Sequence, residues 1–167
     1  PHPGASRSGS IMAKKKENDG RKIIAKNRKA RHEYHIMDTW EAGLVLQGTE
    51  VKALREGRCN LGDSYAELRD GEMWLLKMHI GPYEAGNREN HEPFRRRKLL
   101  LNRREIRKIQ PRIEEQGLTL VPLSLYFKRG LVKVELGLGR GKKLHDKRDD
   151  KAKHDVARRI AREVGRR

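Results

Sequence analysis

The segment VPLSLYFKRGLVKVELGL, residues 121–138, decides the fold class of this 167-residue chain. Apolar side chains occupy every second position on both sides of a turn at residues 128–130. They are Val121, Leu123, Leu125 and Phe127, followed by Val132, Val134, Leu136 and Leu138. This period of two predicts two β-strands, each with one face turned toward a core.

Further strands are predicted upstream of this segment. Residues 65–69 alternate, Asp70-Gly71 supplies a two-residue turn, and residues 73–80 return. Asp-Gly tolerates the positive φ angles of a type I′ turn, so this region predicts a β-hairpin. Residues 33–47 predict another strand, with a kink at Gly43.

Two helices are predicted between the strands. Residues 49–56 form a short helix that is capped by Thr49 and ended by Gly57. Residues 102–117 form a second, in which Asn102 and Glu105 resemble a capping box and Pro111 causes a kink or an early end. Residues 81–93 are rich in Gly, Asn and Pro, and predict a polar loop without a packed element.

Short strands with inserted helices predict a small closed barrel in the α+β class rather than a parallel sheet. The preferred architecture is a five-stranded Greek-key barrel of the oligonucleotide-binding (OB) type with flanking helices. We expect an expression-tag remnant at residues 1–11 before a native Met12, a flexible segment at 12–20, and the barrel at 21–139. Residues 140–167 form a basic tail that is disordered when free and helical when bound, because its apolar stripe is thin.

The charge balance favours a polyanionic partner. Lys and Arg number 40 against 23 Asp and Glu, a formal charge of +17, so nucleic acid is the first candidate. An anionic membrane is the competing partner, but aromatic residues are few, and no apolar run approaches the roughly 20 residues that span a bilayer. We find no signal peptide, and a single cysteine excludes an internal disulfide. These features predict a cytoplasmic protein.

Catalysis is not expected, and neither a cofactor nor a metal ion is predicted. His32 and His35 lie three apart on a predicted strand and would point to opposite faces, which makes them a poor metal pair. Asp149 and Asp150 are adjacent but lie in the basic tail. Residues 63–70 carry carboxylates around a hairpin without an obvious pocket, although a metal-dependent nuclease needs clustered carboxylates.

Two basic runs are candidate RNA-binding segments. Residues 21–31 carry six cations, and residues 141–148 read GKKLHDKR; from Arg140 onward the tail has twelve Lys or Arg against five Asp or Glu. Each run is either a solvated surface or a strap along phosphates, where every neutralised phosphate releases a counterion. At this net charge we favour the straps.

Several motifs together resemble the small protein B family of SsrA-binding proteins over about residues 22–164. They are NRKARHEY (27–34), EAG (41–43), QGTEVKALREG (47–57), DSY (63–65), RKLLLN (97–102), LSLYFK (123–128) and GKKLHDKR (141–148). The resemblance implies a non-catalytic adaptor of trans-translation, which rescues stalled ribosomes. Its barrel would bind the tRNA-like domain of transfer-messenger RNA (tmRNA), and its tail would enter the vacant message channel and decoding centre of the small subunit.

The resemblance also implies which residues contact tmRNA: Arg28, Arg31, His32, Glu41, Lys98, Leu100, Asn102 and Lys133. Glu41 would accept from a base edge or a ribose hydroxyl, and Lys133 would meet a phosphate. The alternatives stay open, because Glu41 and Lys133 are ordinary on a solvated strand face. Asn102 also fits as a helix cap, and His32 as a structural histidine.

The same resemblance assigns the tail to ribosomal RNA. Gly141 would supply the turn between barrel and tail, and His145 would stack on a decoding-centre base. Asp146 would orient a neighbouring cation or accept from a base amine. Cationic contacts to phosphates are expected at Lys142, Lys143, Lys147 and Arg148. Alanyl-tRNA synthetase and the elongation factor that delivers aminoacyl-tRNA would be indirect partners through the RNA.

The main alternative is a generic basic barrel, such as a ribosomal protein or a single-strand binder. Such a binder needs exposed aromatic platforms, whereas the eight aromatic residues of this chain fall mostly at apolar-patterned positions.

Overall fold

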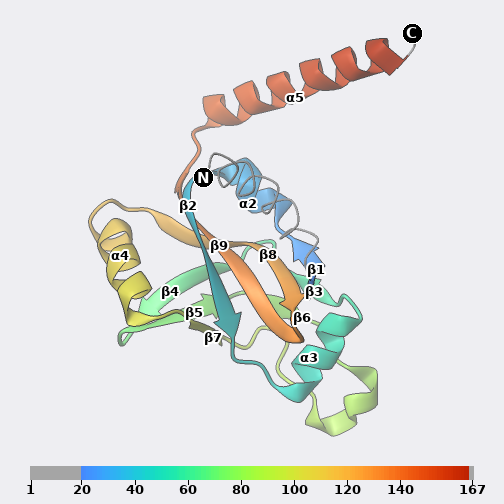
Figure 1. Cartoon of the computed structure of the whole chain (residues 1–167), viewed down its shortest axis with the longest axis vertical. Helices are drawn as coiled ribbons and strands as arrows, with labels where there is room; N and C mark the ends of the chain where they lie inside the picture. Colours follow the sequence, from blue (N-terminus) through green and yellow to red (C-terminus); the bar gives the residue numbers. More distant parts are fainter. Residues whose placement is uncertain (1–19, 166–167) are drawn as a thin grey trace, which may run out of the picture.

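The computed structural model describes residues 20–165, without the side chains of residues 86–88 and 162–165. The predicted tag remnant at 1–11 and all but the last residue of the predicted flexible segment at 12–20 lie outside the described residues. The chain is α+β, as predicted, and Figure 1 shows a ring of strands with helices around it. The elements are β1 Arg21–Lys26, α2 Arg28–Glu33, β2 Tyr34–Leu44, α3 Gly48–Arg55, β3 Cys59–Asn60, β4 Tyr65–Arg69, β5 Glu72–Leu76, β6 His79–Ile80, the 3₁₀ helix η1 Glu84–Glu89, β7 Arg97–Leu100, α4 Arg103–Glu114, β8 Thr119–Lys128, β9 Leu131–Gly141 and α5 Leu144–Gly165.

Six antiparallel strands form the ring in the order β8-β4-β5-β7-β2-β9, and the pairing of β9 with β8 closes it. β1 pairs with β8 as an additional strand, and β3 pairs with β6 as a separate ribbon. The predicted count of five strands was wrong because β7 was missed. Its inward positions are Arg97 and Leu99, so a buried arginine hides the alternation of this four-residue strand.

The 121–138 segment forms β8 and β9, and the predicted inward residues of β9 are confirmed in the main core, but the inward set of β8 differs at Val121 and Leu123. The register passes from Pro122 opposite Leu136 to Ser124 opposite Glu135, which leaves Leu123 as an extra residue in β8. Such a bulge shifts the facing of the strand by one residue. Leu120 and Leu125 therefore enter the main core, whereas Val121 and Leu123 pack under α2 against Ala30.

The 65–80 hairpin is confirmed at its turn. Asp70 and Gly71 have φ angles of 53° and 76°, as a type I′ turn requires. The return strand is shorter than predicted, because β5 ends at Leu76 and Lys77 adopts a φ of 63°. The chain then changes partner, and β6 pairs with β3 instead of continuing along β4.

The helices also depart from the prediction in detail. Gln47 rather than Thr49 precedes the first turn of α3, and its backbone N–H donates to Glu50 Oε1 at 2.8 Å. Asn102 caps α4 as predicted, accepting from the Glu105 N–H at 2.9 Å. α4 runs through Pro111 and ends at Glu114, three residues earlier than the predicted end at 117.

Two further segments that lacked predicted elements are structured. The 81–93 loop contains η1 and the buried His91, whose Nε2 lies 2.9 Å from the Ile80 carbonyl oxygen. The basic run at 21–31 forms β1 and α2.

In β2 the register irregularity falls between Ile36 and Asp38, so the predicted kink site Gly43 lies in regular pairing.

A buried ion pair joins α3 to β7 inside the fold. The side chains of Glu50 and Arg97 are fully buried, and Arg97 Nε donates to Glu50 at 2.5 Å while its Nη1 donates to the Met78 carbonyl at 2.5 Å. Arg95 donates to the other Glu50 oxygen at 2.5 Å. Burial raises the pKa of the Glu50 carboxyl, but the hydrogen bonds from Arg95, Gln47 and Arg97 outweigh it and hold that pKa below its usual range. The pair fixes β7, and with it the outward positions of Lys98 and Leu100.

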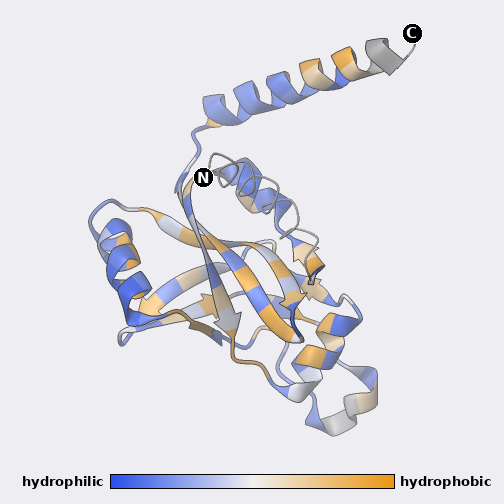
Figure 2. Cartoon of the chain, in the orientation of Figure 1, coloured by the Kyte–Doolittle hydropathy of each residue, from blue (hydrophilic) through white to orange (hydrophobic). Residues whose placement is uncertain are grey.

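α5 projects away from the ring at the end of β9 (Figure 1). Figure 2 shows apolar residues concentrated on the strands, while α5 is mostly hydrophilic with a short apolar stretch toward its end. Its residues 151–161 are all exposed, including Val156 and Ile160 at 49% and 56%. The helix begins at Leu144, within the predicted basic tail at 140–167.

Candidate nucleic-acid interface

Outward side chains of five strands line up across one side of the ring. The register places Leu100 of β7 opposite Gly43 of β2, Gly43 opposite Lys133 of β9, and Lys133 opposite Tyr126 of β8. Tyr126 in turn faces Ile23 of β1. Directly opposed residues in antiparallel strands share a face, so these positions form one continuous row, here called the cross-strand row.

Gly43 allows Leu100 to lie flat across the row. A Cβ atom built at Gly43 would come within 3.3 Å of Leu100 Cδ1, tighter than ordinary contact. The Leu100 side chain is 53% exposed although it is large and apolar. The result is an apolar, solvent-facing surface beside the cation of Lys133, which suits the face of a base or ribose next to its phosphate.

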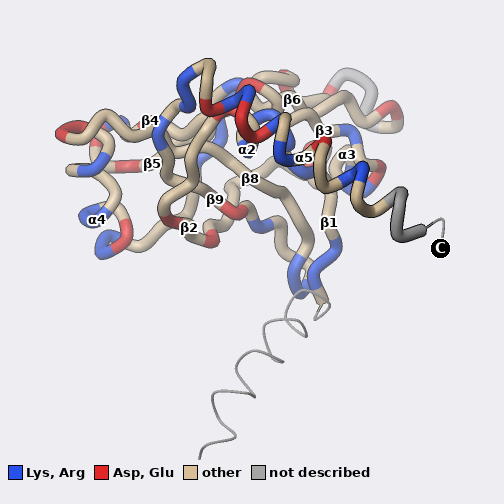
Figure 3. Tube along the Cα trace, turned by 90° about the horizontal axis from the view of Figure 1, so that it is seen from above, with Lys and Arg blue, Asp and Glu red and all other residues tan. Residues whose placement is uncertain are grey.

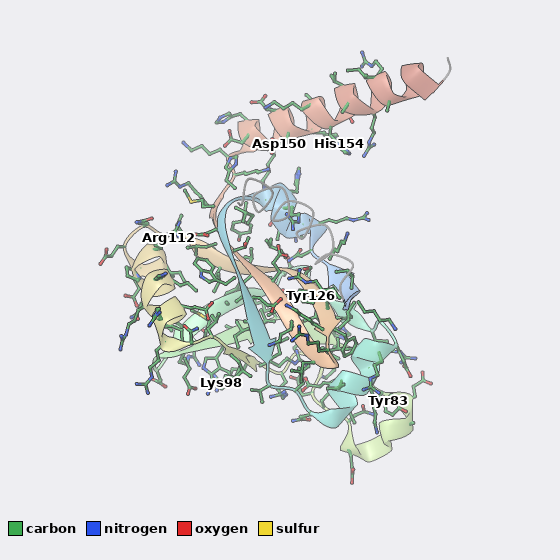
Figure 4. All side chains as sticks on the ribbon, viewed as in Figure 1. Tyr83, Lys98, Arg112, Tyr126, Asp150 and His154 are labelled. Carbon is green, nitrogen blue, oxygen red and sulfur yellow. The ribbon has the colours of Figure 1, made fainter. Side chains whose placement is uncertain are left out.

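Glu41 organises the neighbouring positions of the same face. Its carboxylate accepts from the Tyr126 hydroxyl, from Arg21 at 3.2 Å and from Lys128 at 3.3 Å. The Arg21 guanidinium also lies over the Tyr126 ring, 4.6 Å from its centroid. Glu41 is thus held by three groups from β1 and β8, here called the Glu41 cluster (Tyr126 is labelled in Figure 4).

The ionisation of this cluster follows from its contacts. Partial burial raises the pKa of the Glu41 carboxyl. Hydrogen bonds from Tyr126 and Lys128 and the charges of Lys128 and Arg21 together outweigh the burial, so the pKa lies below its usual range. Burial and the bond to Glu41 raise the pKa of the Tyr126 hydroxyl. At neutral pH Glu41 is therefore an oriented anion and Tyr126 a neutral donor.

A hollow beside the cluster gathers cations. Arg21, Lys26 and Arg31 line it together with Ile23, Leu123, Ser124 and Glu135. Arg31 reaches Glu135 at 3.5 Å while its side chain stays 60% exposed. Three cations around a single carboxylate leave the hollow with excess positive charge, as a phosphate site requires.

The RKLLLN residues lie at a second groove, between β7 and the start of α4. Lys98, Leu100 and Asn102 line it with residues of the 70–73 turn and of α4. Lys98 pairs with Glu72 at 3.0 Å, and the Asn102 side chain is committed to its cap. Arg112 of α4 pairs with Asp38 of β2 at 3.0 Å and fixes the helix beside the ring (Figure 4).

α2 places the remaining body residues. Arg28 and His32 are exposed on its surface, and Asn27 is buried, where it caps the helix and donates to Pro122 O at 2.8 Å. Arg28, Arg31 and His32 therefore share one short helix next to the cation-lined hollow. The structure brings Arg31, Glu41, Leu100 and Lys133 onto one face, with Arg28 and His32 at its edge and Lys98 and Asn102 beside it.

The tail residues split between a junction and an open helix. Gly141 is the last residue of β9, opposite Tyr34, and does not adopt a positive φ, so the predicted turn at this glycine was wrong. The chain turns at residues 142–143 instead. There the Lys142 N–H donates to Glu33 O at 2.7 Å, and its ammonium pairs with Asp150 and lies 3.4 Å from Arg31 O.

Asp146 anchors the first turn of α5. Its carboxylate accepts from the Lys143 N–H at 3.3 Å and lies 3.6 Å from His35 Nε2 and 3.1 Å from His145 Nε2. Desolvation raises the pKa of Asp146. The hydrogen bond from the Lys143 backbone and the interactions with His145 and His35 outweigh it, so the pKa lies below its usual range. Lys143, His145 and Arg148 are exposed, and Lys147 is partly exposed.

Figure 3 shows Lys and Arg distributed over the ring and along α5, with acidic residues interspersed. The sequence reasoning missed Tyr126 and Lys128 as site residues, and it included Arg21 in the basic run at 21–31 without connecting it to Glu41. No local signal marked Tyr126, because its place opposite Lys133 depends on strand register. Among residues 20–165 there is no group of three or more His, Cys, Asp or Glu placed to hold a metal ion. None of the described helices is long and apolar enough to span a membrane.

A basic antiparallel ring with a cation-lined face and a basic helical extension is typical of RNA-binding β proteins. The family model described as "SmpB protein" matches residues 24–166. The chain belongs to the SmpB family, whose members are non-catalytic RNA-binding proteins.

Relatives extend this match over most of the chain. The SsrA-binding protein of Carboxydothermus hydrogenoformans is 60% identical over 139 residues, 83% of this chain and 93% of that protein. The SsrA-binding protein of Mycolicibacterium smegmatis is 54% identical over 156 residues, 93% and 97% of the two chains. A solved structure described as "tmRNA-SmpB: a journey to the center of the bacterial ribosome" matches with a TM-score of 0.61 and 51% identity, over 72% of this chain and 85% of that one.

Proposed function

We propose that this protein binds the tRNA-like domain of tmRNA through the cross-strand row and the Glu41 cluster, and carries it to stalled ribosomes. The observation that carries the proposal is the row itself. It places Leu100, Gly43 and Lys133 side by side, next to the ionised carboxylate of Glu41, which the Tyr126 hydroxyl holds in place. An apolar contact, a cation and an oriented acceptor within a few residues are the elements of RNA recognition at an exposed loop.

The site residues take distinct roles in this proposal. Lys133, Arg28, Arg31 and Lys98 meet phosphates, Leu100 packs on a base or ribose, and Glu41 accepts from a base or a 2′-hydroxyl. His32 stacks or donates at the edge of the face. Asn102 acts through its backbone, because its side chain is the α4 cap.

The tail proposal follows from the exposure of α5. Its helix contributes no residue to the described core clusters, and its apolar side chains as far as residue 161 remain open to solvent. We propose that residues 140–167 become fully ordered only when docked in the vacant message channel. There Lys143, His145, Lys147 and Arg148 contact ribosomal RNA, while Gly141, Lys142 and Asp146 form the junction.

The finer architecture and setting belong to the same proposal. The six-stranded ring acts as an OB-like Greek-key barrel over residues 21–139. Alanyl-tRNA synthetase and the elongation factor act indirectly through the bound RNA, and the ribosome as partner implies a cytoplasmic setting.

A truncation separates the two modules. A chain that ends at Gly141 should bind the isolated tRNA-like domain within about twofold of the full chain, yet support no peptide tagging on stalled ribosomes. Normal tagging by this truncated chain would refute the two-module function. The matched control replaces Lys151 and Lys153 by Gln, which lowers the charge of α5 but keeps its length.

A further inference from the structure

The helix α2 carries three of the proposed RNA-contact residues but is too short to be stable by itself. It spans the six residues Arg28–Glu33, and isolated helices shorter than about 12–15 residues are at best marginal in water. Its buried side chain is Ala30, which packs with Val121 and Leu123 of β8. A single methyl group offers little apolar surface, so polar contacts have to fix the direction of this helix.

Asn27 supplies these contacts from the position just before α2. It is 3% exposed, and its amide oxygen accepts from the Ala30 N–H at 3.1 Å. Its amide nitrogen donates to Pro122 O at 2.8 Å and to Leu61 O at 3.2 Å. Its backbone N–H donates to Leu123 O at 2.8 Å. Asn27 therefore ties the first turn of α2 to β8 and to the loop that precedes β4.

The bulge in β8 provides two of the acceptors. Leu123 is the extra residue of this bulge. The carbonyls of two consecutive residues, Pro122 and Leu123, both accept from Asn27. In a regular strand successive carbonyls point to opposite edges, whereas a bulge breaks this pattern and leaves groups outside the ladder. The bulge and Asn27 together form an attachment point for α2, here called the α2 seat.

The amide of asparagine suits the α2 seat better than the side chains of other capping residues. Ser, Thr and Asp also cap helices, but none has the two donors that the carbonyls of Pro122 and Leu61 accept from Asn27. An aspartate would in addition bury a charge beside two carbonyl oxygens. The residue type at position 27 is thus set by the seat as well as by the cap.

The other polar contacts of α2 are more exposed. Lys29 pairs with Asp63, and Arg31 reaches Glu135 at 3.5 Å, but both cations are more than half exposed, and such ion pairs hold geometry weakly. At its far end the helix accepts one hydrogen bond, from the Lys142 N–H in the junction to α5. The buried seat is therefore the contact that sets the direction of α2.

We infer that Asn27 is a positioning residue for RNA binding. It does not touch RNA, but it holds α2 so that Arg31 projects at the cation-lined hollow, with Arg28 and His32 exposed beside it. The inference rests on the proposed function, in which these three side chains meet the tRNA-like domain.

The test compares Asn27→Ser with Ser64→Ala in the full chain. Asn27→Ser keeps an oxygen that can cap the helix but removes both amide donors, so it weakens the seat. The matched control removes a hydroxyl that is also buried and also donates to Leu61 O, at 2.5 Å, but lies outside α2. Each change is also combined with Arg31→Met, and affinity for the tRNA-like domain is measured for every combination.

In the natural chain and in Ser64→Ala, Arg31→Met should weaken binding about tenfold, as expected for one charged hydrogen bond. In Asn27→Ser the same change should weaken binding by about twofold or less, because Arg31 is already displaced. A merely structural role of Asn27 would lower stability without altering the effect of Arg31→Met. An equal loss in all three backgrounds would therefore overturn the inference.

Amide hydrogen exchange tests the α2 seat without RNA. The Ala30 and Arg31 amides should exchange roughly tenfold faster in Asn27→Ser than in the natural chain or in Ser64→Ala, while the amides of β8 and β9 stay protected. If the natural chain did not bind the tRNA-like domain, the proposed function would fail, but this readout would still decide the seat. Should Asn27→Ser unfold, the natural chain alone decides it: exchange of the α2 amides as fast as those of α5 would overturn the inference, and protection like that of β8 would support it.

Discussion

The outer face of β2, β9 and β8 and the helix α5 both carry basic residues, but their cations are supported in opposite ways. On the ring face Arg21 and Lys128 are held by Glu41, and the face rests on a core in which Leu136 and Val134 are fully buried. On α5 every residue from 151 to 161 is exposed. The ring therefore offers fixed geometry, whereas α5 offers charge on a helix with little tertiary support.

This difference separates specific from general recognition. Fixed positions can discriminate one RNA shape from another, because misplaced groups leave the oriented Glu41 carboxylate without a partner. The exposed cations of α5 can bind any run of phosphates, and a helix with little tertiary support can adapt to the channel that receives it. Substitutions that disturb packing or buried pairs should therefore lower the stability of the ring strongly and affect α5 hardly at all.

The largest effect is expected from Arg97→Met. The substitution leaves Glu50 buried with only Arg95 as an ionic partner, and breaking a buried pair costs about 3–5 kcal/mol. Urea unfolding followed by circular dichroism measures the loss. The control Lys151→Met on α5 should shift stability by less than about 0.5 kcal/mol. Comparable losses in the two variants would erase the contrast between ring and helix.

The ion pair of Glu50 and Arg97 should also make the stability of the protein depend on pH. The folded pKa of Glu50 is lowered, so its stabilising contribution is fully present above the unfolded pKa of about 4.3 and is lost as pH falls through the folded value. Unfolding free energy should thus decline below about pH 4 more steeply in the natural chain than in Glu50→Gln. Parallel pH profiles would show that Glu50 does not carry this dependence.

A smaller effect, on binding rather than folding, is expected from Tyr126→Phe. Loss of the hydroxyl frees one side of the Glu41 carboxylate, and affinity for the tRNA-like domain should fall about tenfold, or about 1.4 kcal/mol. Tyr83→Phe is the matched control, because Tyr83 also has a cation near its ring, Lys52 at 5.5 Å, but lies away from this face (both tyrosines are labelled in Figure 4). Equal affinities in the two variants would remove Tyr126 from the site.

The salt dependence of binding sharpens the role of Lys133. Removing one phosphate contact by Lys133→Met should reduce the slope of log affinity against log salt by about 0.7–0.9. Titrations at several salt concentrations measure this slope. Lys147→Met on α5 should leave the slope for the isolated tRNA-like domain unchanged, and the reverse result would assign the phosphate contact to the tail.

The smallest effect is expected at the junction. The Lys142 hydrogen bond and charge lower the pKa of Asp150, so the contact persists above the unfolded value of about 3.9 and is lost as pH falls through the folded one. Energy transfer between dyes on α5 and on β4 should report freer motion of α5 below that pH, over the pH range in which the ring is still folded. Asp150→Asn should show this freer motion at pH 7. A junction equally mobile in both proteins at neutral pH would contradict the anchoring.

Much of the ring could be predicted from sequence because period-two alternation and the Asp-Gly turn are local signals. β7 could not, because Arg97 occupies a core position, and its burial is tolerable only through partners distant in sequence, above all Glu50, 47 residues away. The bulge at Leu123 could not be predicted either. β8 carries apolar residues at both odd and even positions, so which side chains point inward depends on packing under α2. Glu41, Leu100 and Lys133 were identified through motifs, but their alignment through Gly43 depends on strand register, which is a tertiary property.

The most direct test of the division between ring and α5 is competition binding at fixed physiological salt. Labelled tRNA-like domain of tmRNA is bound by the full chain and challenged with unlabelled tRNA-like domain, ordinary tRNA and unstructured RNA. A fixed ring face predicts that the tRNA-like domain competes far better than the other two, and that neutralising Lys151 and Lys153 does not alter this order. Equal competition by all three RNAs would show that net charge alone governs binding, and would contradict a specific site on the ring.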